Sequence, residues 1–374
     1  MIERKVSYSY LSKQFKNPKG FLKAIQAVVS RGDFTLGQTV TQIENKVAKL
    51  CGTKYAIGVN SGTDALFLIL KTLNIGPGNE VITAPNSFIA TTGAIVQTGA
   101  RPVFVDIQRD YNLNPDLIEE KITSNTKAIL PVHLTGNPAE LDAIVKIANK
   151  HGLWVIEDAA QAIGAQFREK SVGSYGIAAG FSFHPLKNIN GWGDGGMITT
   201  NSDELNERVR LLRNHGLKTR DECVEFGYNS RLDSIQAAIL LEFIDDVCHI
   251  TDKRIKLAQL CDSNLLTLQD FVILPPRRSY VRQVYHTYMI QARNRDALRK
   301  YLEDRHIDVK VHYPIPIHLQ KAASSYGYKK GDFPICEQQT QTILTLPMHQ
   351  ELTEDDVQYM CDQIKNFYFK NSDR

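Results

Sequence analysis

The sequence contains no long hydrophobic run. Its apolar stretches, such as Ala65–Leu70, are far shorter than the roughly 20 residues that a membrane-spanning helix needs. The first residues, Met1–Lys5, lead into a polar segment rich in Tyr and Ser, and no apolar core of a secretory signal follows them. We therefore expect a soluble, cytoplasmic protein that has no membrane partner.

The cysteines lack the spacing of a metal or redox site. No two of them form a Cys-x-x-Cys pair, which argues against a zinc site and against a thioredoxin-like motif. We expect reduced thiols and no bound metal. The cysteines are Cys51, Cys223, Cys248, Cys261, Cys336 and Cys361.

Charge of one sign is also not concentrated anywhere. The chain has 44 Lys and Arg against 41 Asp and Glu, and the formal surplus of +3 is spread along its length. A nucleic-acid-binding protein usually gathers its basic residues into a patch or a tail. We therefore expect no nucleic-acid partner, although a small anionic ligand fits this balance.

Residues 54–200 alternate between short strand-like runs and helical spacing, the pattern of βαβ units in a mostly parallel sheet. In such sheets ligands bind at the carboxyl ends of the strands. The strands are expected at Tyr55–Val59, Glu80–Ala84, Arg101–Val105, Thr126–Leu130, Leu153–Glu157, Ala178–Phe183 and Gly196–Thr199. The helices between them are expected at Thr63–Leu73, Ile89–Thr98, Pro115–Ile122 and Ala139–His151.

The pattern changes after about residue 203. Leu205–Asn214 and a long segment, Ser230–Cys261, have helical spacing, and a charged helix is expected at Arg295–Arg305. A chain of 374 residues favours about two domains. We expect a large α/β domain over residues 1–250, with the N-terminal segment, and a small α+β domain over residues 251–374.

A small polar turn follows the first strand. Ser61, Gly62 and Thr63 stand where the strand ends and a helix begins. Free N–H groups at a helix start form a phosphate site, and Gly62 allows close approach of the backbone. The same residues are also typical of a helix N-cap and turn without a ligand.

Two further strand ends carry charged residues. Asp158 follows an apolar strand, where its carboxylate needs a cationic partner such as a pyridinium nitrogen, and Gln161 lies one turn on. Lys187 follows a later buried strand that ends near Ser182. Desolvation would make this amine nucleophilic enough to form an imine, while the Ser182 hydroxyl could contact a phosphate. The alternatives are a helix-capping Asp and a surface-loop Lys.

The joint order of these motifs resembles the sugar-nucleotide aminotransferase (DegT/StrS) family. The likeness runs from about Gly32 to the segment around His318, and it is carried by four runs in the same order. They are Ser61–Leu66, Glu157–Gln161, Ser182–Asn188 and Gly227–Asp233.

This resemblance implies a fold-type I enzyme dependent on pyridoxal phosphate (PLP), and a homodimer with shared active sites. Lys187 matches the Schiff-base lysine, which also moves the proton between the sugar carbon and the cofactor, and Asp158 matches the partner of the pyridine nitrogen. The remaining matches are Ser61, Gly62, Thr63 and Ser182 to phosphate contacts, Gln161 to the ring hydroxyl, Phe88 to the stacked aromatic ring, and Asn229 to a phosphate contact from the neighbouring subunit. Core packing remains an alternative for Phe88, as a helix N-cap does for Asn229.

Substrate residues are implied by the same resemblance. Tyr313 and His318 lie in a segment similar to the family's Tyr-Pro-x-Pro-x-His stretch beside the sugar. Arg231 is a candidate cation for the diphosphate or for the donor's carboxylate, with a helix-surface role as the alternative. Thr135–Asn137 and His184–Leu186 depart from common family patterns, which leaves the sugar undetermined.

The sequence thus predicts a PLP-dependent transfer of an amino group from an amino acid, expected to be L-glutamate, to a nucleotide-linked keto sugar. Position 3 is favoured slightly over position 4. One rival is a sugar dehydratase of the same family, in which a His replaces the lysine, so Lys187 counts against it. Another is a non-catalytic regulator that retains the fold, against which Lys187, Asp158 and Ser182 all count.

Overall fold

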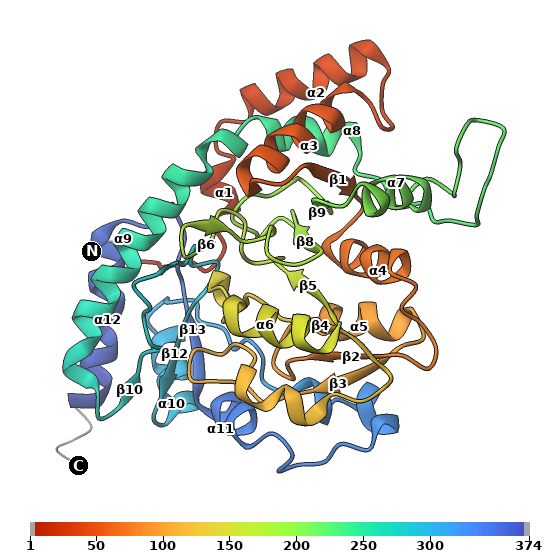
Figure 1. The fold of residues 1–374 in the computed structure, drawn as a ribbon. Coiled ribbons are helices and arrows are strands. Elements are labelled where there is room, and N and C mark those ends of the chain that lie inside the picture. The colour runs from red at the N-terminus through yellow and green to blue at the C-terminus, as the bar shows by residue number, and fades with distance from the viewer. Residues whose placement is uncertain (1–3, 370–374) are drawn as a thin grey trace.

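A seven-stranded sheet forms the centre of the computed structural model, which describes residues 4–369 (Figure 1). Its strand order is β1-β9-β8-β5-β4-β2-β3, and all strands run parallel except β9, which is antiparallel to both neighbours. The prediction of a mostly parallel sheet is confirmed. The strands are β1 (Tyr55–Val59), β2 (Glu80–Thr83), β3 (Arg101–Phe104), β4 (Thr126–Leu130), β5 (Trp154–Asp158), β8 (Ala178–Ser182) and β9 (Gly196–Thr200).

Helices cover both faces of this sheet, which is why its strands are buried almost without alternation. Four of them were expected from the sequence: α4 (Gly62–Thr72), α5 (Ile89–Gln97), α6 (Leu141–His151) and α7 (Asp203–Leu212). The short α1 (Leu11–Gln14) and two longer helices, α2 (Lys19–Arg31) and α3 (Gln38–Cys51), were not predicted. Each of the longer two ends at a left-handed glycine, Gly32 and Gly52.

Two predicted helices are wrong in detail. Pro115–Ile122 forms only the 3₁₀ turns η1 (Pro115–Leu117) and η2 (Glu119–Lys121), because Ile118 between them is buried in the core and Ile122 is already extended. The long segment Ser230–Cys261 is divided into α8 (Ser234–Leu241), the turn η4 (Ile244–Asp246) and α9 (Val247–Leu265). The break lies at Phe243, which leaves helical geometry and is buried in the core.

The C-terminal part has its own core. An antiparallel sheet of β10 (Val272–Ile273), β12 (Tyr288–Ala292) and β13 (Ile343–Leu346) packs with α9, α10 (Arg295–Glu303) and α12 (Glu354–Phe369). The remaining elements are β6 (Gln166–Phe167), β7 (Lys170–Ser171), β11 (Val281–Arg282), η3 (Leu134–Gly136), η5 (Leu266–Leu268), η6 (Ile317–Leu319), η7 (Lys321–Tyr326) and α11 (Pro334–Thr342).

Helix α9 joins the two cores. Val247 and Ile250 pack with the large sheet, whereas Leu257 and Leu265 pack in the C-terminal core. The predicted domain boundary at 250/251 falls within this helix and stays a prediction. The two predicted domains also include residues 1–3 and 370–374, which lie outside the described range. No helix within residues 4–369 combines the length and the apolar character needed to cross a bilayer.

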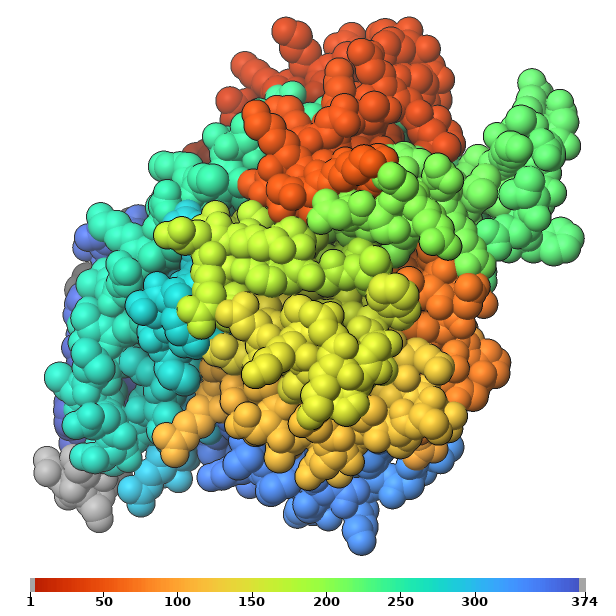
Figure 2. Space-filling model, in the orientation of Figure 1, coloured from red at the N-terminus to blue at the C-terminus, as the bar shows by residue number. Residues whose placement is uncertain are grey.

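An arm projects from the body between α7 and α8 (Figures 1 and 2). Two isolated antiparallel bridges close it, Leu217 with Cys223 and, at its base, Asn214 with Asn229. Phe226 near its end is 97% exposed. The Phe226 ring is therefore almost entirely open to solvent in the single chain.

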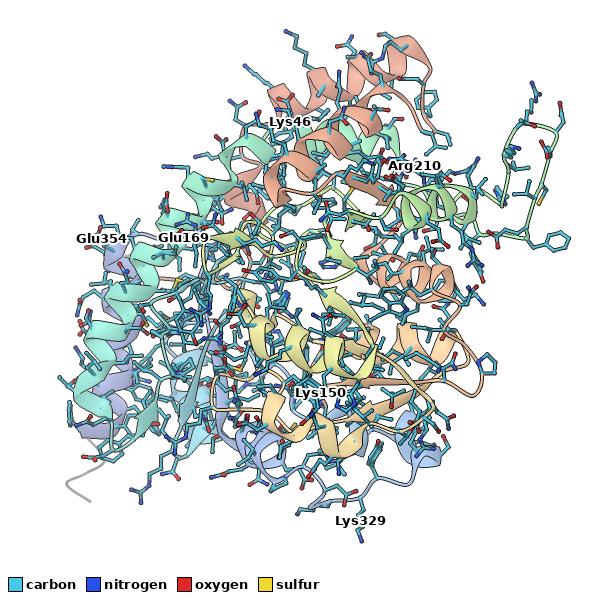
Figure 3. The ribbon with its side chains drawn as sticks, viewed as in Figure 1. Lys46, Lys150, Glu169, Arg210, Lys329 and Glu354 are labelled. Carbon is cyan, nitrogen blue, oxygen red and sulfur yellow. The ribbon has the colours of Figure 1, made fainter. Side chains whose placement is uncertain are left out.

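A buried ion pair connects α3, β1 and α7. Glu44 Oε1 accepts hydrogen bonds from the Gly58 amide at 2.8 Å and from Arg213 Nη1 at 2.6 Å. Arg210, labelled beside α7 in Figure 3, donates to the other carboxylate oxygen at 3.0 Å. By contrast Lys46, on the same helix as Glu44, pairs with Asp245 at an exposed position.

We expect Glu44→Ala to reduce the free energy of unfolding by roughly 3–5 kcal/mol, because it leaves Arg213 buried and unpaired. Lys46→Ala is the matched control on the same helix, and its expected effect is below about 1 kcal/mol since the pair is exposed. Urea denaturation of both variants measures the difference. Equal losses would contradict a structural role for the buried pair.

Candidate active site

A cavity of ≈ 320 Å³ lies at the carboxyl edge of the central sheet. Its walls come from the segments after β1, β2, β4, β5 and β8, from Tyr8, and from residues 286, 287, 289, 312 and 313 of the C-terminal part. Nine of the residues singled out in the sequence meet here. They are Ser61, Gly62, Thr63, Phe88, Asp158, Gln161, Ser182, Lys187 and Tyr313.

One end of the cavity is formed by the start of α4. Ser61 is the N-cap, and its hydroxyl accepts a hydrogen bond from the Asp64 amide at 3.1 Å. The capping interpretation is therefore correct, yet it still leaves the helix-start amides of Gly62 and Thr63 at the cavity wall. A Cβ on Gly62 would come within 2.8 Å of the Ser182 Cβ, so only glycine allows these two segments to approach so closely.

Lys187 lies in the loop after β8 and faces the cavity. Burial lowers the pKa of its amine to about 8, although the Asp158 carboxylate acts in the opposite direction. A minority of this amine, roughly a fifth, is therefore neutral near physiological pH, far more than for an ordinary lysine. The Tyr10 hydroxyl donates to the Lys187 carbonyl oxygen at 2.7 Å, which fixes the backbone of the loop.

Asp158 ends β5 and is buried beside the same cavity. Its Oδ2 accepts from the Thr91 hydroxyl at 2.7 Å, and Oδ1 accepts from the Ala160 amide at 3.1 Å. Burial raises the pKa of this carboxyl group, and these two donors together with Lys187 limit the rise. The backbone is also fixed, because the Asp158 amide donates to the Pro131 carbonyl at 2.9 Å.

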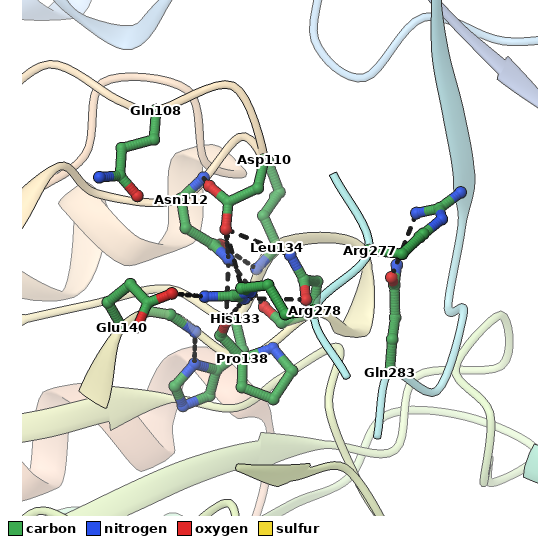
Figure 4. A network of polar contacts seen from close by, with 12 residues as sticks. Gln108, Asp110, Asn112, His133, Leu134, Pro138, Glu140, Arg277, Arg278 and Gln283 are labelled. Atoms are coloured by element: carbon green, nitrogen blue, oxygen red, sulfur yellow. Dashed lines mark hydrogen bonds and ion pairs between the residues drawn. The ribbon is translucent and has the colours of Figure 1, made fainter. Parts of the chain in front are cut away.

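The loop that contacts Gln161 belongs to a polar network around Asp110, Asn112 and Arg278 (Figure 4). The Thr135 amide donates to Gln161 Oε1 at 2.7 Å, and the Leu134 amide beside it donates to Asn112 at 3.2 Å. Arg278 holds the far side of this loop through Asp110 at 3.3 Å and through further bonds to Asn137, Pro138 and Glu140. The contact to Gln161 uses only the backbone of Thr135. The departure of residues 135–137 from the common family pattern therefore does not remove this contact.

Phe88 and Tyr313 form an aromatic wall. Their ring centroids are 5.8 Å apart, and Phe88, the N-cap residue of α5, is 53% exposed. Core packing, the alternative weighed from the sequence, does not describe a ring this exposed. A flat ligand could therefore stack on Phe88.

Several cavity residues were missed in the sequence. Tyr8 and His286 came from segments without a recognisable motif, whereas His184 and His312 stand inside motifs that were quoted for other residues. Burial lowers the pKa of His286 and brings that of His312 to about 4, with Lys187 adding to both effects, so these rings are neutral. Ser87 was also missed, although it flanks Phe88 directly.

Three predicted site residues lie outside this cavity. His318 is 2% exposed, and its Nε2 is 3.0 Å from Glu337 Oε1, because the turn η6 packs its ring edge-on against Phe333. The structure thus does not bring His318 to the cavity. Asn229 and Arg231 lie at the base of the arm, where Arg231 donates to Asn214 at 2.9 Å.

The arrangement combines four chemical features in one space. The α4 amides suit a phosphate, the exposed Phe88 ring suits a flat ligand, and the Asp158 carboxylate suits a protonated ring nitrogen. The Lys187 amine suits attack on a carbonyl carbon. These features fit the shape and charges of a pyridoxal phosphate cofactor.

Comparison with known proteins agrees with this geometry. A pleiotropic regulatory protein of Geobacillus stearothermophilus is 43% identical over 96% of this chain and 97% of its own length. A dTDP-3-amino-3,6-dideoxy-α-D-galactopyranose transaminase of Aneurinibacillus thermoaerophilus is 41% identical over 93% of this chain and 95% of its own. The solved structure of NtdA from Bacillus subtilis, described with bound cofactor PMP, matches with a TM-score of 0.89 and 32% identity, covering 97% of this chain and 86% of NtdA.

The sequence model of one protein family matches nearly the whole chain, over residues 17–365. The resemblance predicted from four short motifs is thereby confirmed. The chain belongs to the DegT/DnrJ/EryC1/StrS aminotransferase family.

Proposed function

We propose that this aminotransferase binds PLP through Lys187 and transfers an amino group from an amino acid to a 3-keto sugar linked to a nucleotide. One observation carries the proposal: a desolvated amine, a buried carboxylate and a helix-start phosphate site line one cavity. When bound, PLP supplies an electron-withdrawing ring that stabilises negative charge on the substrate carbon. The PMP described in NtdA belongs to the same class of cofactor.

Different residues of this chain would contact different parts of the cofactor. The amides of Gly62 and Thr63, with the Ser61 and Ser182 hydroxyls, would hold the phosphate. Phe88 would cover one face of the ring, and the Gln161 amide would meet the ring hydroxyl. Asp158 would hold the ring nitrogen in its protonated form.

Lys187 would then serve as acid and base. Its side chain lines the cavity, where a free amine would lie beside the bound cofactor and substrate. With a pKa near 8, it can both accept and return a proton at neutral pH. This is the role that a dehydratase of the family could not fill in the same way, because it carries His at this position.

The choice of sugar rests on the relatives and on one wall of the cavity. The transaminase of A. thermoaerophilus is named for an amino group at position 3, which supports a 3-keto substrate here. Tyr313 and the neutral ring of His312 line the cavity from the C-terminal part of the chain and would contact the sugar. A screen of nucleotide-linked 3-keto and 4-keto sugars, with L-glutamate consumption as the readout, tests this assignment.

A regulatory role is the second candidate, and the name of the G. stearothermophilus relative favours it. A regulator that has lost catalysis has no need of a cavity amine with a lowered pKa. Turnover of an amino donor by the purified protein distinguishes the two functions, whereas a yellow colour from bound PLP does not. Absence of turnover with every sugar in the screen would favour the regulator.

We further propose a homodimer with shared active sites. Asn229 and Arg231 lie at the base of the arm and do not line the cavity of their own chain, so a second subunit could receive them. Asn229 would donate its side-chain amide to the cofactor phosphate, and Arg231 would pair with the diphosphate or with the donor's carboxylate. The exposed Phe226 ring is a natural contact for that subunit.

The covalent link gives the first prediction for this site. After borohydride reduction, mass spectrometry should find the PLP adduct on Lys187, and Lys187→Ala should abolish transamination with little loss of stability. The rate of adduct formation by the PLP-free protein should rise with pH around 8, because only the neutral amine attacks the aldehyde. An adduct on Lys170 or Lys218 would refute the site assignment.

The second prediction concerns Asp158. In Asp158→Asn the ring nitrogen is no longer held protonated, so turnover should fall by several orders of magnitude. Occupancy should stay near normal when PLP is in excess, because Lys187 and the phosphate site remain. Absorbance reports the occupancy and glutamate consumption reports the turnover. Wild-type turnover in this variant would reduce Asp158 to a structural residue.

The third prediction tests the shared site by subunit mixing. Asn229→Ala should weaken PLP binding, and it should recover activity when mixed with inactive Lys187→Ala chains. In each hybrid dimer one site carries both defects and the other carries neither. Each variant incubated alone is the control. No recovery despite verified subunit exchange and an impaired Asn229→Ala parent would place Asn229 in its own subunit's site.

A further inference from the structure

The first turn of α5 carries two hydroxyl groups that the proposed chemistry does not yet use. Ser87 precedes the helix and Thr91 lies one turn further on, with their Oγ atoms 2.6 Å apart. Thr91 Oγ1 in turn donates to Asp158 Oδ2 at 2.7 Å. The three side chains are 3%, 1% and 5% exposed.

The direction of this chain follows from counting protons. A hydroxyl group has one hydrogen to donate, and that of Thr91 is given to Asp158. The hydrogen between the two hydroxyls must therefore come from Ser87. Ser87 donates to Thr91, and Thr91 donates to the carboxylate, so both hydroxyl dipoles point toward the negative charge.

The carboxylate needs this support because it is buried. An ionised group out of water is costly unless donors surround it, and burial alone favours the protonated form of Asp158. A protonated carboxyl group lacks the negative charge that keeps a ring nitrogen protonated. The Thr91 hydroxyl is the strongest of the interactions that oppose this protonation.

We propose that Thr91 and Ser87 are positioning residues for Asp158, and that their hydroxyl chain keeps this carboxylate ionised and turned toward the ring nitrogen of the cofactor. The inference rests on the proposed use of the cavity for PLP. Phe88 stands between the two hydroxyls in sequence. One segment of five residues would thus control both the stacking of the ring and the charge opposite its nitrogen.

The test compares three single variants by titrating the PLP-free protein with PLP. Thr91→Val removes the hydroxyl and keeps the shape, so the dissociation constant should rise roughly tenfold to a hundredfold, the usual effect of losing a hydrogen bond to a charged group. Thr91→Ser should bind almost as wild type. Thr92→Val is the matched control, since the Thr92 hydroxyl is buried on the same helix without a partner in the described structure.

Two outcomes of this titration would overturn the proposal. If Thr91→Val and Thr92→Val lose affinity equally, the loss reflects helix packing and not the carboxylate. If Thr91→Ser binds as weakly as Thr91→Val, the methyl group and not the hydroxyl is what matters. Rescue by Ser with an unaffected Thr92→Val supports the positioning role.

Ser87 is tested through its dependence on Thr91. Ser87→Ala should weaken PLP binding less than Thr91→Val does, and it should have no further effect in a Thr91→Val protein, because Ser87 acts only through Thr91. Additive losses in the double variant would mean that Ser87 contacts the cofactor directly. That result would contradict the one-way chain.

A cofactor-free measurement separates this inference from the proposed function. In the PLP-free protein, Thr91→Val should raise the unfolding equilibrium constant about tenfold, but less than about threefold in an Asp158→Asn background, where the charge is gone. Failure of wild type to form an adduct on Lys187 would refute the PLP function while this coupling persists. An uncoupled pair would refute the hydroxyl chain even if PLP binds at Lys187.

Discussion

Burial of opposite charges in one cavity is the constraint on which this structure depends. The Lys187 amine and the Asp158 carboxylate are both removed from bulk water. Burial lowers the pKa of the amine and raises that of the carboxyl group, so it favours the neutral form of each. Each charge then depends on what surrounds it. For Asp158 the support is explicit, with Thr91 and the Ala160 amide on its two oxygens. The loops that supply such donors must hold their geometry closely, and much of the fold can be understood as providing that rigidity.

The central sheet and its connections supply the rigidity that the cavity needs. Parallel strands bring the ends of β1, β2, β5 and β8 to one edge, and the antiparallel β9 closes the gap between β1 and β8, pairing Gly196 with both Val59 and Ser182. The polar network around Arg278 fixes the loop that holds Gln161, while the Tyr10 hydroxyl fixes the loop of Lys187. Residues far apart in sequence thus converge on a small volume, and hydrogen bonds hold the loops that carry Gln161 and Lys187.

Sequence reasoning found the strands and the charged residues at their ends, because those signals are local. Each strand is a short apolar run, and Asp158 and Lys187 are conspicuous for following one. It failed where long-range packing decides: Phe243 breaks the long helix to enter the core, and His318 turns away from the cavity toward Glu337. Tyr8 was also out of reach, since its place in the cavity depends on pairing near residue 307. Ser87 and Thr91 could have been found from the sequence, because they lie on either side of Phe88 and four residues apart, which is about one helical turn.

That pairing near residue 307 bears on how the chain folds as it is made. Val6 donates to the His306 carbonyl and accepts from the Asp308 amide, both at 2.9 Å. The ribosome adds roughly 5–20 residues per second, so these partners emerge about 15–60 s after Val6 does. The central sheet can form during that interval, whereas the backbone bonds of Val6 form only after residues 306–308 have emerged. The segment next to Tyr8 and the cavity wall around His312 and Tyr313 are therefore completed only late in synthesis, and a nascent chain completes its scaffold well before it completes its active site.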